Sequence, residues 1–145
     1  MPSRDATSRW QGDLLHGKGA VSLDSSNAGE FDVSFPTRAA GPDGQTSPEK
    51  LLAAAHSSYL AMNLSGVLGA ENLTATSTDV SVGVTAGSAT GGGFEISGVA
   101  IVLRAELDGV DAARFGELAT VAEQTCPISK ALAGTTITLD AALTS

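Results

Sequence analysis

The sequence contains little cysteine, little histidine, few aromatic residues and little positive charge, and each shortage excludes a class of function. Cys126 is the only cysteine among 145 residues, so the chain cannot form an internal disulfide. His16 and His56 are the only histidines, and with that thiol they have no ligand spacing for a structural zinc site. We therefore expect neither a metal nor another cofactor, and any redox chemistry has to use one thiol.

Positive charge is too scarce and too scattered to bind nucleic acid. Lys and Arg number 8 against 16 Asp and Glu, a net charge of −8, and no stretch collects the basic residues into a stripe that could follow phosphates. The N-terminal stretch MPSRDATSRW has no apolar core of the kind that a signal peptide needs. We expect a cytoplasmic protein with neither a nucleic-acid nor a membrane partner.

Residues 47–69 form the longest apolar segment and carry their own helix signals. Ser47 can accept hydrogen bonds from the free amides of a first helical turn, Pro48 suits the first helical position, and Glu49 suits the positive end of the helix dipole. Gly69 is a natural stop. Apolar side chains recur at helical spacing, namely Leu51, Leu52, Ala55, Tyr59, Met62 and Leu68. Because almost every face is apolar or small, we expect a buried central helix, which its polar residues keep from spanning a membrane.

Alternation of apolar and polar side chains predicts strands on both sides of this helix. Phe31, Val33 and Phe35 alternate with polar residues, so one side of that strand should face a core. The predicted strands are residues 8–11, 19–23, 29–35, 73–85, 94–107 and 135–143, and the predicted further helices are residues 112–123 and 127–134. We therefore expect one α+β domain over residues 1–145, with residues 1–7 frayed.

The segment before the helix, residues 36–46, is a predicted loop with one cation, Arg38. That arginine is either solvated or the partner of an anion or of a carboxylate such as Glu49, since a guanidinium can make a paired contact with a carboxylate. Near the other end of the chain, Pro127 suits the first position of a short helix, which sets Cys126 at the positive end of its dipole. A thiolate is favoured at such a position.

The order of these motifs resembles the OsmC/Ohr family of osmotically inducible and organic hydroperoxide resistance proteins, from Trp10 onward. The matching residues are Thr37-Arg38, Ser47-Pro48-Glu49, Leu51-Leu52, Ala54-Ala55-His56, Met62 with Leu64-Ser65, and Cys126-Pro127-Ile128-Ser129. The resemblance implies an intertwined homodimer of α+β subunits, with antiparallel sheets wrapped around long central helices and two sites at the subunit interface. It also implies a peroxiredoxin-like role in the oxidative stress response, the thiol-dependent reduction of small organic hydroperoxides.

Members with full motifs look like thiol peroxidases in which a cysteine on the central helix attacks the peroxide and a second, in the Cys-Pro turn, closes a disulfide. Arg38 and Glu49 match residues that would lower the pKa of the attacking thiol and orient the peroxide. In this sequence the position of the attacking cysteine, three residues after His56, is Tyr59. A phenol, with a reference pKa of about 10, forms neither a sulfenic acid nor a disulfide, so the two-cysteine cycle is closed to this chain.

Three interpretations follow from that substitution. In the first, Cys126 acts with Arg38 and Glu49 as a one-cysteine peroxidase that an external dithiol recycles. In the second, the protein keeps a pocket at the dimer interface, with Tyr59 and His56 in it, and binds a small apolar ligand without reducing it. In the third, Tyr59 is a core aromatic residue and the pocket is closed. A histidine on a helix that is expected to be buried, such as His56, is more often a core residue with its hydrogen bonds satisfied than a catalytic base.

The spacing of Glu49 and Tyr59 bears on the oligomeric state. The two residues are ten positions apart on one predicted helix, which is about 15 Å along its axis, so they cannot meet within that helix. If both line one site, a second chain supplies one of them. This geometry favours a dimer independently of the resemblance.

Overall fold

The computed structural model describes residues 2–35 and 45–144 of a chain that divides into two compact units, Met1–Leu51 and Leu52–Ser145. Arg38, the predicted loop cation, lies outside the described residues. Within the described ranges, no helix is both long enough and apolar enough to cross a membrane.

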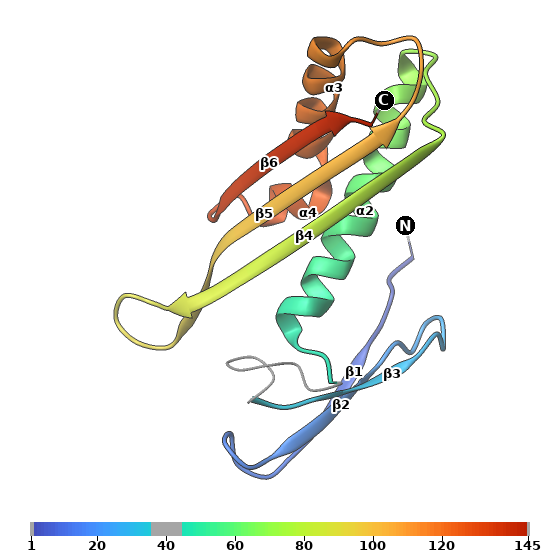
Figure 1. Ribbon diagram of the computed structural model, residues 1–145. Coiled ribbons are helices and arrows are strands. Elements are labelled where there is room, and N and C mark those ends of the chain that lie inside the picture. Colours follow the sequence, from blue (N-terminus) through green and yellow to red (C-terminus); the bar gives the residue numbers. More distant parts are fainter. Residues whose placement is uncertain (1, 36–44, 145) are drawn as a thin grey trace. The chain divides into compact units, whose positions relative to one another are not determined.

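The first unit holds a three-stranded antiparallel sheet in the order β1-β2-β3, built from the first three predicted strands (Figure 1). Its strands are β1 (Thr7–Gln11), β2 (Lys18–Ser22) and β3 (Glu30–Val33). Residues that face each other across paired strands share a face of the sheet. Arg9, Ala20 and Asp32 are aligned in this way on a polar face, and the apolar residues Trp10, Val21 and Phe31 lie on the opposite face.

The apolar face of this sheet is less covered than the sequence predicts. Phe31 is 41% exposed and Trp10 is also exposed, whereas Val21 of the middle strand is buried. The expectation that Phe31 faces a core is therefore wrong for the single chain. Alternation along a strand determines which face is apolar, but it does not determine what covers that face.

The helix α2 (Pro48–Ala70) begins and ends within a residue of the predicted bounds. The Ser47 hydroxyl accepts a hydrogen bond from the backbone N–H of Lys50 at 3.2 Å, as an N-cap does. At the other end, the N–H of Leu73 returns to the carbonyl of Leu68 at 2.9 Å and closes the last turn. Local signals in the sequence are thus sufficient to define this element.

Only one side of α2 is buried in the single chain. The buried residues are His56, Leu60, Leu64 and Leu68, each four positions after the last, which is a single stripe along a helix. Met62, on another face, is 72% exposed. The prediction of a helix buried on almost every face is therefore wrong for the chain alone. Small and apolar side chains permit burial, but a second surface has to supply it.

The second unit contains a three-stranded sheet in the order β4-β5-β6 and two further helices. Its elements are β4 (Ser77–Ser88), β5 (Phe94–Glu106), α3 (Ala112–Thr125), α4 (Pro127–Ala131) and β6 (Thr136–Leu143). β4 and β5 pair antiparallel through a hairpin in which Gly91, Gly92 and Gly93 all have positive φ, a conformation that glycine adopts without strain. The two strands overlap the predicted strands over residues 73–85 and 94–107.

β6 pairs with β5 in parallel, so the expectation of purely antiparallel sheets is wrong. A strand that runs parallel to its predecessor needs a crossover, and α3 and α4 supply it (Figure 1). The crossover helix starts as predicted, since the Oδ1 of Asp111 accepts a hydrogen bond from the N–H of Arg114 at 2.8 Å.

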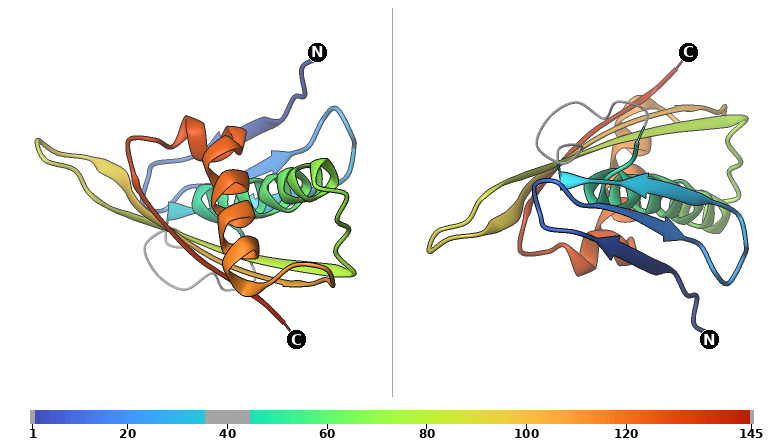
Figure 2. Two further views of the ribbon diagram at one scale, coloured as in Figure 1. Left: turned by 90° about the horizontal axis from the view of Figure 1, so that it is seen from above. Right: turned by 90° about the horizontal axis from the view of Figure 1, so that it is seen from below.

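The core of the second unit is formed by the sheet, α3 and the buried stripe of α2, with both helices on the same side of the sheet (Figure 2). β5 contributes alternate residues, Val99, Ile101, Leu103 and Ala105, and α3 contributes Phe115, Leu118, Ala119 and Ala122. Cys126, which follows α3 directly, belongs to the same core. Packing therefore brings the helix of the candidate site and the lone thiol into one apolar cluster.

Candidate functional site

Cys126 lies at the corner between α3 and α4, where the sequence places it. Its backbone N–H donates to the carbonyl of Glu123 at 3.2 Å, and its own carbonyl accepts from the N–H of Lys130 at 2.9 Å. The residue therefore closes one helix and opens the next. Its side chain is 0% exposed and makes no capping hydrogen bond to α4. The predicted position is confirmed, but in the single chain solvent does not reach the thiol.

His56 is a fully buried residue of α2 that contacts α4. Its Nε2 and the Oγ of Ser129 are 2.8 Å apart, and both side chains are buried. Its Nδ1 has no hydrogen-bond partner among the residues that the structure describes. Burial lowers the pKa of the imidazole, and the negative charge of Glu123 offsets only part of that effect. His56 is thus a core histidine bonded through one nitrogen, and not a base open to solvent.

Asn63 makes a second polar contact between α2 and this corner. Its Nδ2 donates to the carbonyl of Ala122 at 2.7 Å and to the Oγ1 of Thr125 at 2.8 Å. Together with the bond between His56 and Ser129, this contact holds the chain on both sides of Cys126 against α2. Sequence reasoning assigned Asn63 no such role. The available signal was an amide within an otherwise apolar helix, since a polar group in such a place usually has a specific partner.

Tyr59 is not a core residue of the single chain, since it is 45% exposed. The interpretation in which its ring is buried in this chain is therefore wrong. Several neighbouring positions on the uncovered part of α2, including Ala55, Ser58 and Met62, are also exposed. Between Leu51 and Ala70 the helix carries no charged side chain, so this exposed surface is apolar or weakly polar along its length.

Glu49 occupies the first turn of α2 and is half-buried. The predicted contact between Glu49 and Arg38 involves a residue outside the described ranges, so it stays a prediction. Tyr59 lies on the same continuous helix, ten positions further along. As the sequence predicts, the two residues are therefore ten positions apart on one helix and cannot meet within one chain.

The first unit contains an apolar cavity at the start of α2. It has a volume of about 410 Å³, and its lining is almost entirely apolar, with Trp10, Leu14, Val33, Phe35 and Pro48 joined by two serines. Pro48 directly precedes Glu49, so the cavity lies beside one of the predicted site residues. A cavity of this size and character suits a small organic molecule.

Comparisons with known proteins agree over nearly the whole chain. A family model described as OsmC-like protein matches residues 41–140. Peroxiredoxin OsmC of Escherichia coli (strain K12) and its counterpart in Shigella flexneri are each 37% identical to this chain over 136 residues, which cover 94% of this chain and 93% of those proteins.

Solved structures with the same fold include two organic hydroperoxide resistance proteins. One, from Elizabethkingia anophelis with thiocyanate bound, has a TM-score of 0.79 and 27% identity and covers 99% of this chain and 98% of its own. The other, OhrB of Bacillus subtilis, has a TM-score of 0.68 and 24% identity, covers 97% of this chain and 98% of its own, and supports the fold alone.

Proposed function

Because this chain belongs to the OsmC-like family, we propose that it binds small apolar molecules of the organic hydroperoxide class and does not reduce them through a two-cysteine cycle. Its relatives named peroxiredoxin or organic hydroperoxide resistance protein support this choice of ligand. The role is then one in oxidative stress defence, by sequestering or sensing such molecules.

The proposal depends on one observation: the phenol of Tyr59 is accessible to solvent, whereas the thiol of Cys126 is not. Tyr59, at the position that the resemblance gives to the attacking cysteine, is 45% exposed, whereas the only thiol of the chain is 0% exposed. The group that can meet a ligand is therefore a phenol, which offers a hydroxyl for hydrogen bonding but forms no sulfenic acid. The buried Cys126 has no open route to a peroxide in the single chain, which argues against the one-cysteine peroxidase.

The apolar cavity at the start of α2 supports the class of ligand. Trp10, Leu14 and Phe35 are among the apolar residues that line a volume of about 410 Å³, and the polar share of the lining is small. Alkyl and aryl hydroperoxides combine an apolar body with one polar end, so they match such a cavity. Glu49 and Arg38 remain the proposed polar partners for that end.

We also place the site in a homodimer. Tyr59 and Met62 are large apolar side chains exposed on α2, and exposed apolar surface of this kind often marks an interface. Glu49 cannot reach Tyr59 along its own helix, because ten residues span about 15 Å. A second copy of the chain would bring Tyr59 of the partner subunit to Glu49 and complete the site.

A peroxidase assay tests the catalytic part of this proposal. The wild type, with cumene hydroperoxide and excess dithiothreitol, is expected to consume peroxide at the rate of the buffer alone. Cys126→Ser is expected to behave like the wild type, and Tyr59→Cys is expected to raise consumption above background. Wild-type consumption that disappears in Cys126→Ser would instead establish the one-cysteine peroxidase.

A fluorescence titration tests the binding part. Trp10 is the only tryptophan and lines the cavity, so its emission reports occupancy. Titration with the alcohol product of cumene hydroperoxide is expected to change that emission saturably. Leu14→Ser is expected to weaken binding, whereas Leu15→Ser, at an exposed neighbour outside the lining, serves as the matched control. Equal binding by both variants would rule out this cavity as the site.

A further inference from the structure

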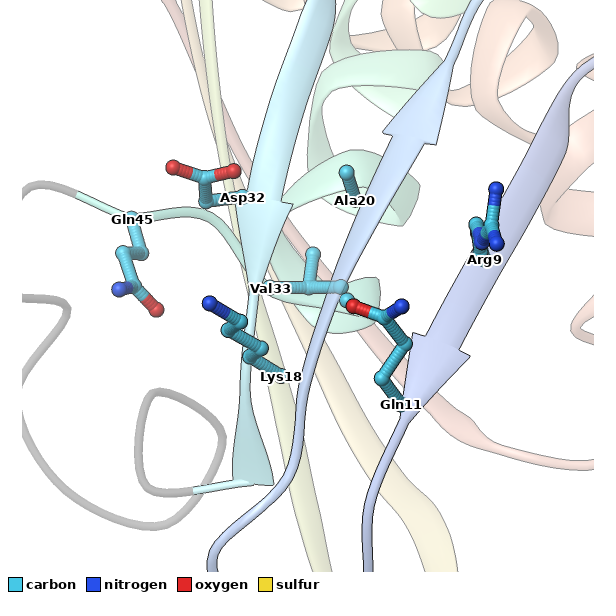
Figure 3. Close-up of a pocket in the computed structure, with 8 residues that line it drawn as sticks. Arg9, Gln11, Lys18, Ala20, Asp32, Val33 and Gln45 are labelled. Carbon is cyan, nitrogen blue, oxygen red and sulfur yellow. The ribbon is translucent and has the colours of Figure 1, made fainter.

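A second hollow lies on the polar face of the first sheet. It has a volume of about 280 Å³, and five polar side chains surround the small Ala20. Figure 3 shows Arg9 and Gln11 on one side of Ala20, and Lys18, Asp32 and Gln45 on the other. Arg9 and Gln11 come from β1, Lys18 and Ala20 from β2, and Asp32 from β3, so all three strands shape the hollow.

The strand register sets a cation and an anion on opposite sides of this hollow. Arg9 pairs with Ala20, and Ala20 pairs with Asp32, so the three residues form one row across the sheet. Neighbouring strands are about 4.8 Å apart, which separates the backbones of Arg9 and Asp32 by roughly 10 Å. Only the methyl group of Ala20 stands between them in that row. The floor of the hollow is therefore low, and its two walls carry opposite charges.

Within the described part of the chain, these charged side chains have no partner of opposite charge. The side chains of Arg9, Lys18 and Asp32 take part in none of its ion pairs or side-chain hydrogen bonds, whereas Arg104 and Arg114 each pair with a carboxylate. Arg9 and Asp32 also do not pair with each other across Ala20, although they face the same space. Both groups are thus available to a third molecule.

We propose that this hollow binds a small zwitterion, an amino acid or a short peptide, with its carboxylate on Arg9 and its ammonium group on Asp32. A guanidinium matches a carboxylate through two parallel hydrogen bonds, and a carboxylate accepts from an ammonium group. The amides of Gln11 and Gln45 can bond the polar groups of the ligand between its ends.

The size of the hollow limits the ligand to a few residues. A volume of about 280 Å³ is at the lower end of small-molecule sites, which suits an amino acid or a dipeptide. Because the site is open to solvent and its contacts are ionic, we expect weak binding, with a Kd on the order of 1 mM at low salt. The inference is independent of Tyr59, Cys126 and the proposed function above.

An NMR titration of the full chain with glycylglycine tests the proposal, with acetate and methylammonium as probes that carry one charge each. Saturable shifts are expected at the backbone amides of Arg9, Ala20 and Asp32, and tighter binding of glycylglycine than of acetate. Arg9→Gln is expected to weaken glycylglycine binding at least about tenfold. Asp32→Asn is expected to weaken glycylglycine but to leave acetate unchanged or tighter, because the repulsion of Asp32 is removed.

Two further variants distinguish specific binding in the hollow from nonspecific attraction to a charged surface. Arg4→Gln removes an exposed cation outside the hollow and is expected to bind glycylglycine as the wild type does. Ala20→Leu keeps every charge but raises the floor, and it is expected to abolish the saturable shifts. The proposal is overturned if no saturable shift occurs, if Arg9→Gln binds like Arg4→Gln, or if acetate binds as tightly as glycylglycine.

Discussion

His56 and Asn63 are the polar residues through which α2 holds the corner that carries the only thiol. His56 bonds Ser129 on α4, and Asn63 bonds the last turn of α3, so the two contacts enclose Cys126 between them. The bond of His56 is buried and the bond of Asn63 to the Ala122 carbonyl is partly buried, so loss of one partner leaves the other unsatisfied. The accessibility of the thiol therefore depends on these two side chains as well as on apolar packing.

Removal of the Asn63 amide is expected to loosen that corner and expose the thiol. In Asn63→Ala, alkylation of Cys126 by N-ethylmaleimide under native conditions should be faster than in the wild type by roughly tenfold, because a partly buried hydrogen bond is worth about 1 kcal/mol or somewhat more. Mass spectrometry of quenched time points measures the rate. Thr120→Ala on the exposed side of α3 is the control and should leave the rate unchanged. An unchanged rate in Asn63→Ala would mean that packing alone shields the thiol.

His56 makes stability depend on pH in a defined direction. Its pKa in the folded chain is lowered by burial, whereas in the unfolded chain it is about 6.5. The unfolded chain therefore binds the proton first as the pH falls. The free energy of unfolding should be unaffected by this residue above about pH 7.5, fall as the pH drops below about 6.5, and level off only below the folded pKa.

Urea unfolding of the wild type and His56→Gln at several pH values isolates that contribution. The variant lacks the titrating imidazole, so the stability difference between the two proteins should shrink from pH 8 to pH 5. His16, the other histidine, is exposed and common to both proteins. Parallel pH curves would show that His56 does not titrate between the folded and unfolded states in this range.

At the scale of elements, the helix α3 has one side that packs in the core and another that is exposed. Leu118 is buried in the core, and Val121, three positions further along, is 45% exposed. The same helix also forms most of the crossover that makes β5 and β6 parallel. Its buried face is therefore needed both for the core and for the order of the strands.

Two substitutions on α3 should separate these faces. Leu118→Ala is expected to lower the free energy of unfolding by about 2–5 kcal/mol, since it leaves a cavity beside the sheet. Val121→Ala is expected to change it by no more than about 0.5 kcal/mol, because the side chain is exposed and alanine is the better helix former. Chemical denaturation measures both. A similar loss in the two variants would contradict the assignment of the faces.

At the scale of the whole molecule, the surface of α2 that carries Tyr59 and Met62 has no cover within the described chain. The proposed homodimer supplies that cover with a second copy. Met62→Glu should then shift the protein from the mass of two chains toward that of one in light scattering coupled to size exclusion, because it would bury a charge. Val121→Glu, at an exposed apolar position on α3, is the control and should leave the mass unchanged. A wild type with the mass of one chain would refute the dimer.

Most of the element order follows from the sequence, because its signals are local. Ser47 and Pro48 begin α2, Asp111 begins α3, and Pro127 begins α4, each through hydrogen bonds or backbone limits within a few residues, whereas the predicted stop Gly69 lies inside α2, which ends at Ala70. Cys126 could be placed at its corner for the same reason. That Tyr59 stands at the position of the attacking cysteine rests on the resemblance of the motif around His56, and it stays a prediction.

Burial, pairing direction and polar partners were decided only in three dimensions, because they depend on residues far apart in the chain. The sequence shows that α2 is apolar on many faces, but packing chose the stripe through Leu60 and Leu64 and left Tyr59 exposed. It contains the strand over residues 136–143, but the crossover made that strand parallel to β5. The bonds of His56 to Ser129 and of Asn63 to the end of α3 join positions 73 and 59 residues apart, and no local pattern specifies such contacts.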